Sequence, residues 1–238
     1  MKFKFLKSTY QYKPKLASTL FFIFALLILV GLSLWQIKRL HWKEALISER
    51  IERFESQSTL LNELDKPEDK EFRKVVIKAK YLKEHLMFMP ALSKNGNNGY
   101  HIILPVELFN GEKIIFDSGW IPLRLKEKDF FNDKKFKTIE AVIRLPGRKG
   151  KFQPDNDIKN NFWFFVDTHQ MSRFTSIDLN KNFYLEAVNN GESGYPLGKQ
   201  TRIYIRNNHL QYAITWFLIA CGLVGVYIAA NIKKINKN

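Results

Sequence analysis

The side chains that could do chemistry in this chain gather just ahead of its second long apolar run, in TRIYIRNNHLQYAITW, residues 201–216. A helix that begins near Asn208 places four of them on one stripe, at positions i, i+3, i+4 and i+7: His209, Tyr212, Ala213 and Trp216. The stripe offers an imidazole in its first turn and flat aromatic surfaces below. A haem that entered edge-on would find an axial nitrogen ligand in His209, apolar walls in the two rings, and a guanidinium for its propionates in Arg206.

The same residues have a simpler interpretation. Asn207 and Asn208 are typical helix N-caps, and His209 would then do no more than occupy the first turn. Rings near the ends of apolar runs are typical of the membrane-water boundary, where amphipathic aromatic side chains are enriched; four are placed this way: Trp35, Trp42, Tyr212 and Trp216. The residues alone leave both interpretations open.

Two apolar runs must position this stripe, residues 16–37 and 212–232. Each has about twenty residues without a charge, which is enough for a helix to cross ~30 Å of hydrocarbon. Two buried helices of a soluble protein fit the pattern poorly, because such helices are usually shorter and keep a polar face. We therefore predict two transmembrane helices.

The first run also resembles a secretory signal, since basic residues precede it. It is longer than the usual core of about 7 to 15 residues, and no small-residue cleavage site precedes the charged sequence that follows. A mitochondrial transit peptide would be richer in arginine and serine. We expect a retained anchor in a bacterial inner membrane.

The formal net charge of +15 is that of many nucleic-acid-binding proteins, but its distribution indicates topology instead. Acid-free basic tails flank the two runs, with lysines at 2, 4, 7, 13 and 15 and at 233, 234 and 237. Under the positive-inside rule both termini are cytoplasmic, and the long middle segment is periplasmic. The remaining positive charge suits anionic lipid headgroups or an acidic partner, and no nucleic-acid partner is expected.

The predicted organisation therefore has five parts. They are a cytoplasmic basic tail (1–15), a first transmembrane helix (16–37), an external periplasmic domain (38–211), a second transmembrane helix (212–232) and a second basic tail (233–238). Apolar residues at helical spacing after residue 37 indicate an amphipathic extension of the first helix.

The external domain is predicted to be mainly antiparallel β, as a sheet or a small barrel. Asn110-Gly111 between two β-rich runs is a strong hairpin signal, and a short helix is expected near 168–174. The expected strands are 72–82, 99–109, 112–121, 138–145, 162–166, 182–188 and 202–207. The fold class is thus an α+β membrane protein, with two transmembrane helices flanking an external β domain.

Other chemistry finds little support. The single cysteine, Cys221, lies in the second apolar run, which excludes a disulfide or thiolate pair in the external domain. Asp117-Ser118-Gly119 lacks the flanking glycine of a nucleophile elbow, and Asp117 is assigned to the hairpin. Asp167 and His169 have no third metal ligand near them in sequence. We expect no enzyme activity.

Four segments resemble signatures of the Surfeit locus protein 1 family, the assembly factors of cytochrome c oxidase. In chain order they are SLWQIKRLHWK (33–43), GYHIILPVEL with DSGWIP (99–122), QPDNDIKNNFWFFVD (153–167) and QTRIYIRNNHLQYAITW (200–216). The first and last are the most specific, and the resemblance also covers the layout of two spans around one external domain. Two departures are Ser33, where the family commonly has glycine, and Ser118, where it commonly has arginine.

The resemblance implies a role in inserting haem a into oxidase subunit I, with His209 as the haem-iron ligand and Arg206, Tyr212 and Trp216 around it. It implies oxidase subunit I, haem a synthase and the lipid bilayer as partners. The first motif is matched by Trp35, Gln36, Arg39, Trp42 and Lys43, and the last by Arg206, Asn207, Leu210, Gln211, Tyr212, Thr215 and Trp216. The alternative is a scaffold that binds no haem and holds subunit I and the haem-synthesis enzymes together.

Overall fold

The computed structural model describes residues 2–5, 8–93, 95–131, 135–147 and 149–235. Lys7 and Lys237 of the predicted basic tails lie outside these residues. The chain divides into two compact units, one formed by its two ends up to Ile47 and from Ile205, and the other by Ser48–Tyr204.

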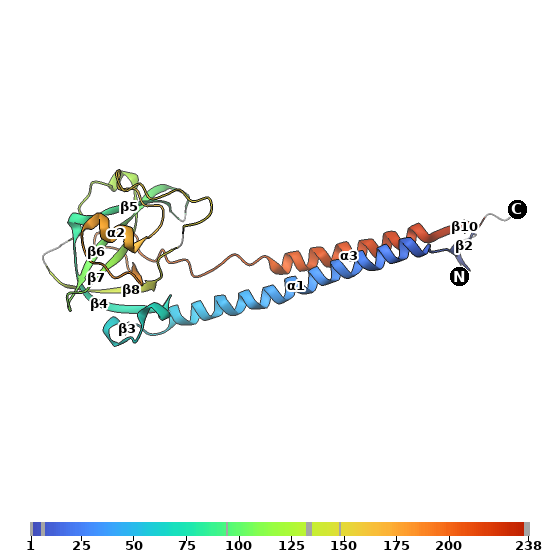
Figure 1. Ribbon diagram of the computed structural model, residues 1–238, viewed down its shortest axis with the longest axis horizontal. Helices are drawn as coiled ribbons and strands as arrows, with labels where there is room; N and C mark the ends of the chain where they lie inside the picture. The colour runs from blue at the N-terminus through green and yellow to red at the C-terminus, as the bar shows by residue number, and fades with distance from the viewer. Residues whose placement is uncertain (1, 6–7, 94, 132–134, 148, 236–238) are drawn as a thin grey trace. The chain divides into compact units, whose positions relative to one another are not determined.

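Two antiparallel helices make up most of the first unit, α1 (Leu16–Glu55) and α3 (His209–Asn231) (Figure 1). Tyr227 joins them near one end, where its hydroxyl lies 2.6 Å from Thr19 Oγ1 and its ring stacks on Phe22 at 4.0 Å. Further along, the Ser33 hydroxyl donates to the carbonyl oxygen of Ala213 at 3.0 Å. Small and polar side chains at such contacts are typical of helix pairs in membranes.

Both helices are long and apolar enough to cross a membrane. In their most apolar windows only 6% and 11% of the residues are buried, so most of this apolar surface is left for lipid. These features indicate membrane anchoring. α1 continues without a break for 40 residues, so the predicted amphipathic extension after residue 37 is confirmed as part of one helix.

The chain ends form a small antiparallel sheet in the order β1 (Lys2–Phe5), β2 (Ser8–Tyr12) and β10 (Ile232–Ile235). We expected only basic tails here. The Lys-Phe-Lys-Phe sequence of β1 has the two-residue period of a strand, which explains the difference.

A closed, mainly antiparallel sheet forms the second unit and confirms the predicted fold class. In spatial order its strands are β4 (Lys74–Tyr81), β8 (Lys137–Arg144), β9 (Tyr184–Ala187), β7 (Lys113–Pro122) and β6 (Asn98–Leu108). The sheet closes because β6 also pairs with β4, from Ala79↔Leu108 to Tyr81↔Val106. β3 (Thr59–Leu60) extends the sheet beside β4 and β5 (Met87–Leu92) extends it beside β6. The remaining elements are the 3-10 helices η1 (Leu61–Glu63), η2 (Pro67–Lys70), η3 (Lys83–His85) and η4 (Leu123–Leu125), and helix α2 (Thr168–Thr175).

Two apolar clusters stabilise this unit. The larger joins side chains of the five barrel strands, among them Ile77, Leu104 and Phe116. The smaller lies between strands β5 to β7 and α2, with Trp163 fully buried in it. Strand β6 contributes to both clusters, so its residues 102–106 are all buried.

The hairpin and the short helix are confirmed. Gly111 has φ 88°, a conformation that favours glycine, and the Asn110 side chain accepts a bond from the Glu112 amide at 3.0 Å. The predicted strands at 162–166 and 202–207 are wrong, since the first makes only isolated bridges and the second is assigned no strand. The first is a loop whose aromatic side chains cover the sheet, and the second is a connecting segment. Strand β5 was missed because Pro90 interrupts its pattern.

Candidate functional site

The start of α3 lies where the sequence predicted it, with Asn208 as N-cap. The Asn208 side chain makes no capping bond; with its amide oxygen turned toward Arg206, it accepts from Nε at 2.9 Å and Nη2 at 2.8 Å. The Asn207 side chain reaches the His209 amide only at 3.5 Å. Side-chain capping is therefore weak here, and a capping role does not account for the polar residues before the helix.

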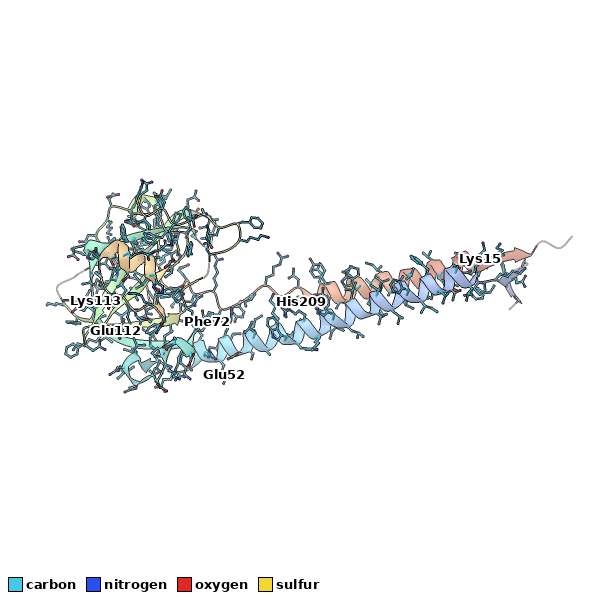
Figure 2. All side chains as sticks on the ribbon, in the orientation of Figure 1. Lys15, Glu52, Phe72, Glu112, Lys113 and His209 are labelled. Atoms are coloured by element: carbon cyan, nitrogen blue, oxygen red, sulfur yellow. The ribbon has the colours of Figure 1, made fainter. Side chains whose placement is uncertain are left out.

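His209 faces the other helix (Figure 2), and its Nδ1 lies 2.7 Å from Oε1 of Gln36 on α1. Gln36 is only 9% exposed, in a helix whose neighbouring residues are mostly exposed apolar side chains. With the Gln36 amide oxygen as acceptor, the tautomer that satisfies this contact carries its proton on Nδ1. In that tautomer the lone pair lies on Nε2, which makes no hydrogen bond with the described residues. A fixed Nδ1 and a free Nε2 are the arrangement found in metal-ligating histidines.

The spacing of α1 explains why Gln36 meets His209. The less exposed positions of this stretch are Ser33, Gln36, Leu40 and Lys43, which share one face of the helix. At the outer end of this face, Lys43 Nζ donates to the carbonyl oxygen of Arg206 at 2.6 Å. The backbone just before α3 is thus held by α1 at the same level as the imidazole.

The predicted aromatic walls are only partly assembled. Ala213 is 3% exposed against α1 and Trp216 is half-buried, whereas Tyr212 lies on the flank of the stripe and is 53% exposed. Arg206 is exposed and bonds only to a neutral amide among the described residues. Its guanidinium remains available to a carboxylate.

Other residues near the helix ends do not join the site. His41 Nδ1 lies 3.3 Å from Glu44 of its own helix and is exposed, so the structure does not bring it to His209. The Arg39 guanidinium stacks over the Trp42 ring at 3.8 Å. Among the residues that the structure describes, no group of three or more His, Cys, Asp or Glu side chains could hold a metal ion.

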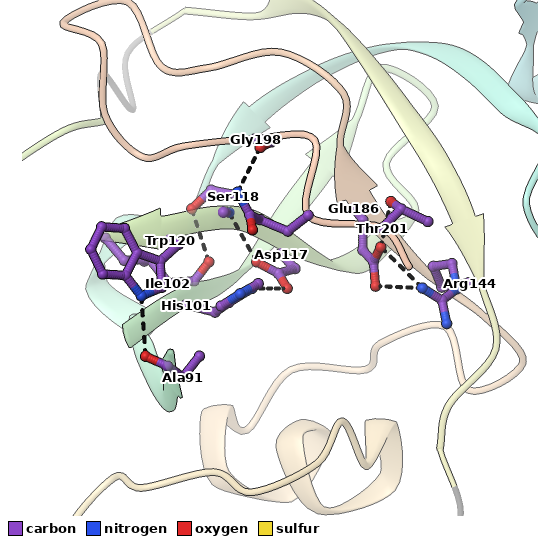
Figure 3. A network of polar contacts seen from close by, with 12 residues as sticks. Ala91, His101, Ile102, Asp117, Ser118, Trp120, Arg144, Glu186, Gly198 and Thr201 are labelled. Carbon is purple, nitrogen blue, oxygen red and sulfur yellow. Dashed lines mark hydrogen bonds and ion pairs between the residues drawn. The ribbon is translucent and has the colours of Figure 1, made fainter. Parts of the chain in front are cut away.

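A buried polar network in the second unit was not predicted from the sequence (Figure 3). His101 Nδ1 lies 2.7 Å from Asp117 Oδ2, and the two side chains are 14% and 5% exposed. Burial acts to lower the pKa of His101, but the charge and hydrogen bond of Asp117 outweigh it and the pKa is raised. The hairpin register could have shown this pair, because Asp117 lies opposite Ile103, two residues from His101.

The neighbouring part of the network centres on Glu186. Its carboxylate accepts from Arg144 Nη1 at 3.0 and 3.1 Å, from the Tyr184 hydroxyl at 3.0 Å and from the Thr201 hydroxyl at 2.6 Å. Thr201 belongs to the segment that leaves the barrel, so the network ties that segment to the sheet. Such buried, mutually bonded side chains indicate a structural role.

Comparison with known proteins then identifies the family. A family model described as the SURF1 family matches residues 23–221. The chain belongs to the SURF1 family. It is similar to the SURF1-like proteins of Rickettsia bellii (30% identical over 224 residues, covering 90% of this chain and 89% of the relative) and Rickettsia conorii (29% over 210 residues, 84% and 85%). It is also similar to Surfeit locus protein 1 of Takifugu rubripes (27% over 231 residues, 86% and 93%).

The SURF1 match covers most of α1, the barrel and the first part of α3, so it includes both sides of the His209–Gln36 contact. It also includes Ser33, whose hydroxyl bridges to α3. The glycine common at this position, as the sequence resemblance implies, would lack that bond. In this SURF1 chain a side-chain hydroxyl therefore contributes to the contact next to Gln36.

Proposed function

We propose that this SURF1 protein is a membrane-anchored assembly factor, not an enzyme, that receives haem a and assists its insertion into subunit I of cytochrome c oxidase. The observation that carries the proposal is the state of His209. Its Nδ1 is held by the buried Gln36 amide at 2.7 Å, while its Nε2 makes no hydrogen bond with any residue that the structure describes.

The described residues fit such a cargo. A haem supplies an iron with open axial positions and two propionate groups. Nε2 of His209 would take one axial position, and the exposed Arg206 guanidinium would bind a propionate. Trp216 and Tyr212 would cover part of the ring, although Tyr212 contributes from the flank of the stripe.

A single protein ligand also suits transfer. With His209 as the proposed ligand and no cluster of three or more His, Cys, Asp or Glu side chains among the described residues, the cargo would be held less firmly than in an acceptor with two axial ligands. The hydrogen bond between Nδ1 and Gln36 would fix the orientation of the imidazole before the cargo arrives. Collection and release then need no chemical step by the protein.

The proposed function includes a membrane topology for the chain. Both termini are cytoplasmic, and the barrel domain lies in the periplasm beside a bacterial inner membrane, because the tails are basic and free of acids. Oxidase subunit I and haem a synthase are the proposed partners, within the lipid bilayer.

The direct test is an optical spectrum of the full-length protein, purified from cells that make haem a. The wild type is expected to carry a low-energy haem a absorption, and His209→Ala is expected to lose it. His41→Ala is the matched control. This imidazole lies on α1 five residues after Gln36, but it is exposed and paired with Glu44. A wild type without haem, or an alanine variant with an unchanged spectrum, would refute the ligand assignment.

Failure of that test would favour the scaffold alternative. Crosslinking in intact membranes would then recover subunit I and haem a synthase equally well with wild type and His209→Ala. Loss of both crosslinks in the variant would instead tie partner binding to the imidazole.

A further inference from the structure

An apolar groove lies at the free edge of the barrel sheet, far in sequence from His209. Its volume is about 410 Å³, and its walls include Pro90 and Leu92 of β5, Tyr100 of β6, Leu123 of η4, and Phe162. Leu92 and Leu123 are 60% and 51% exposed. Both leucines lie on one open groove, and contiguous exposed apolar surface of this kind is typical of sites that bind a ligand or a partner.

The backbone of this edge argues against an added peptide strand. β5 is the last strand of the sheet, and among the described residues its outer side is paired at Phe88, whose carbonyl accepts from the Trp163 amide at 2.9 Å. Alternate residues of a strand face the same side, so Pro90 is the next outward position. Proline has no N–H to donate, and a peptide strand would meet a missing bond there. An occupant that needs no backbone bonds fits better.

The groove has unpaired positive charge beside it. Lys126 Nζ lies 5.1 Å from the ring centre of Phe88 and 5.3 Å from the ring centres of Tyr100 and Phe162. Tyr100 and Phe162 line the groove. Arg124, two residues away on the same turn, is exposed. Neither cation has an ion-pair partner among the described residues. A lysine and an arginine without ion-pair partners among the described residues, next to an apolar groove, complement an anion with a long apolar tail, although Glu127 adjoins Lys126 in the sequence.

We propose that this groove binds an anionic phospholipid of the membrane that anchors the chain. One acyl chain would lie between Leu92 and Leu123, and the headgroup phosphate would meet Lys126 and Arg124. Phosphate binding by Arg and Lys is charge-assisted, and the apolar wall accounts for the tail. This proposal is independent of haem binding, since none of its residues contacts His209.

The test uses the full-length protein in nanodiscs, with Cys221→Ser so that one introduced cysteine carries a spin label. The label is placed at Leu92→Cys and its collision rates with oxygen and with a water-soluble nickel complex are measured. In discs of phosphatidylcholine with added phosphatidylglycerol, the nickel collision rate at residue 92 is expected to fall and the oxygen rate to rise, relative to phosphatidylcholine alone. Leu60→Cys is the matched control, because Leu60 is 47% exposed at another edge of the sheet.

Charge variants decide whether the headgroup is recognised. Arg124→Gln leaves the aromatic rings untouched and is expected to raise the phosphatidylglycerol concentration needed for the shift about five-fold, the effect of one cation near an anionic surface. Lys126→Met keeps the apolar stem on the rings and should act likewise. One molar salt should weaken the shift, since it shortens the Debye length from about 10 Å to about 3 Å.

Three outcomes would overturn the proposal. They are no shift at residue 92, an equal shift at residue 60, which would indicate general adsorption, or a shift that oleate produces and phosphatidylglycerol does not. The last would assign the groove to a free fatty acid.

Discussion

At the scale of single residues, the contact between Gln36 and His209 decides what the imidazole can do. A histidine in the first turn of a membrane helix has two nitrogens to satisfy, and Gln36 satisfies Nδ1 at 2.7 Å while leaving Nε2 free. Histidine at this position was predicted from the sequence as a ligand, together with a family motif that contains Gln36. The hydrogen bond itself was not predictable, because it depends on the register of two helices 173 residues apart in the chain.

Removing the amide should therefore weaken haem binding without removing the ligand. Gln36→Leu leaves Nδ1 without its acceptor, and loss of such a supporting bond typically costs about 10- to 100-fold in metal affinity. Haem titration of the purified variant, followed by absorbance, measures this loss. Gln57→Leu, an exposed glutamine beyond the end of α1, is the control and should titrate like wild type. Equal affinities for all three proteins would contradict the role of Gln36.

His101 gives the barrel a pH dependence of known sign. Burial and the charge of Arg202 act to lower the pKa of His101, whereas the charges of Asp117 and Glu186 raise it. The net effect is a raised pKa. Because the folded pKa lies above the ordinary value of 6.5, the stabilisation is complete below about pH 6.5 and is lost as pH rises through the folded pKa. Denaturant unfolding in micelles at a series of pH values should show this decline.

The substitution His101→Gln should flatten that decline, while His169→Gln, which changes an exposed histidine, should leave it intact. A decline that persists unchanged in His101→Gln would assign it to another group.

At the scale of elements, the spacing between α1 and α3 positions the site. Ala213 is 3% exposed where the Ser33 hydroxyl meets its carbonyl oxygen, so the helices approach closely there. A larger side chain at this point would separate the two elements one helical turn from His209.

Ala213→Leu is expected to destabilise the helix pair by about 1–3 kcal/mol through overpacking and to reduce haem recovery together with it. Unfolding in micelles and the haem a spectrum measure the two effects. Ala229→Leu, at an exposed position of the same helix, should change neither. Full haem recovery in Ala213→Leu would show that close helix contact is not needed.

Most helices and strands could be predicted from periodicity and turn chemistry. The two wrongly predicted strands share one cause, which is that strand pairing cannot be deduced from composition. Residues 162–166 have the composition of a strand, but Trp163 is buried as part of a loop that covers the sheet, with its indole N–H donating to Asn161 at 2.9 Å. Residues 202–207 alternate like a strand yet lack a neighbour to pair with. Composition and period describe the faces of a segment, whereas pairing depends on which strands lie nearby.

At the scale of the whole molecule, the account requires the barrel and the basic tails to lie on opposite sides of the membrane. The single native cysteine makes this testable by labelling. In a Cys221→Ser background, Phe109→Cys at the exposed hairpin tip should react with an impermeant maleimide in intact spheroplasts. Lys233→Cys, in the second tail, should react only after permeabilisation. The reverse pattern would invert the topology and remove the periplasmic assignment.

The most direct test of the central claim is the haem a content of oxidase subunit I in cells whose only SURF1 protein is His209→Ala. The variant must be present at the wild-type level, with the barrel intact by its unfolding transition. The account predicts a marked loss of haem a in subunit I, while His41→Ala cells retain the normal content. Normal haem a content in the His209→Ala cells would contradict it.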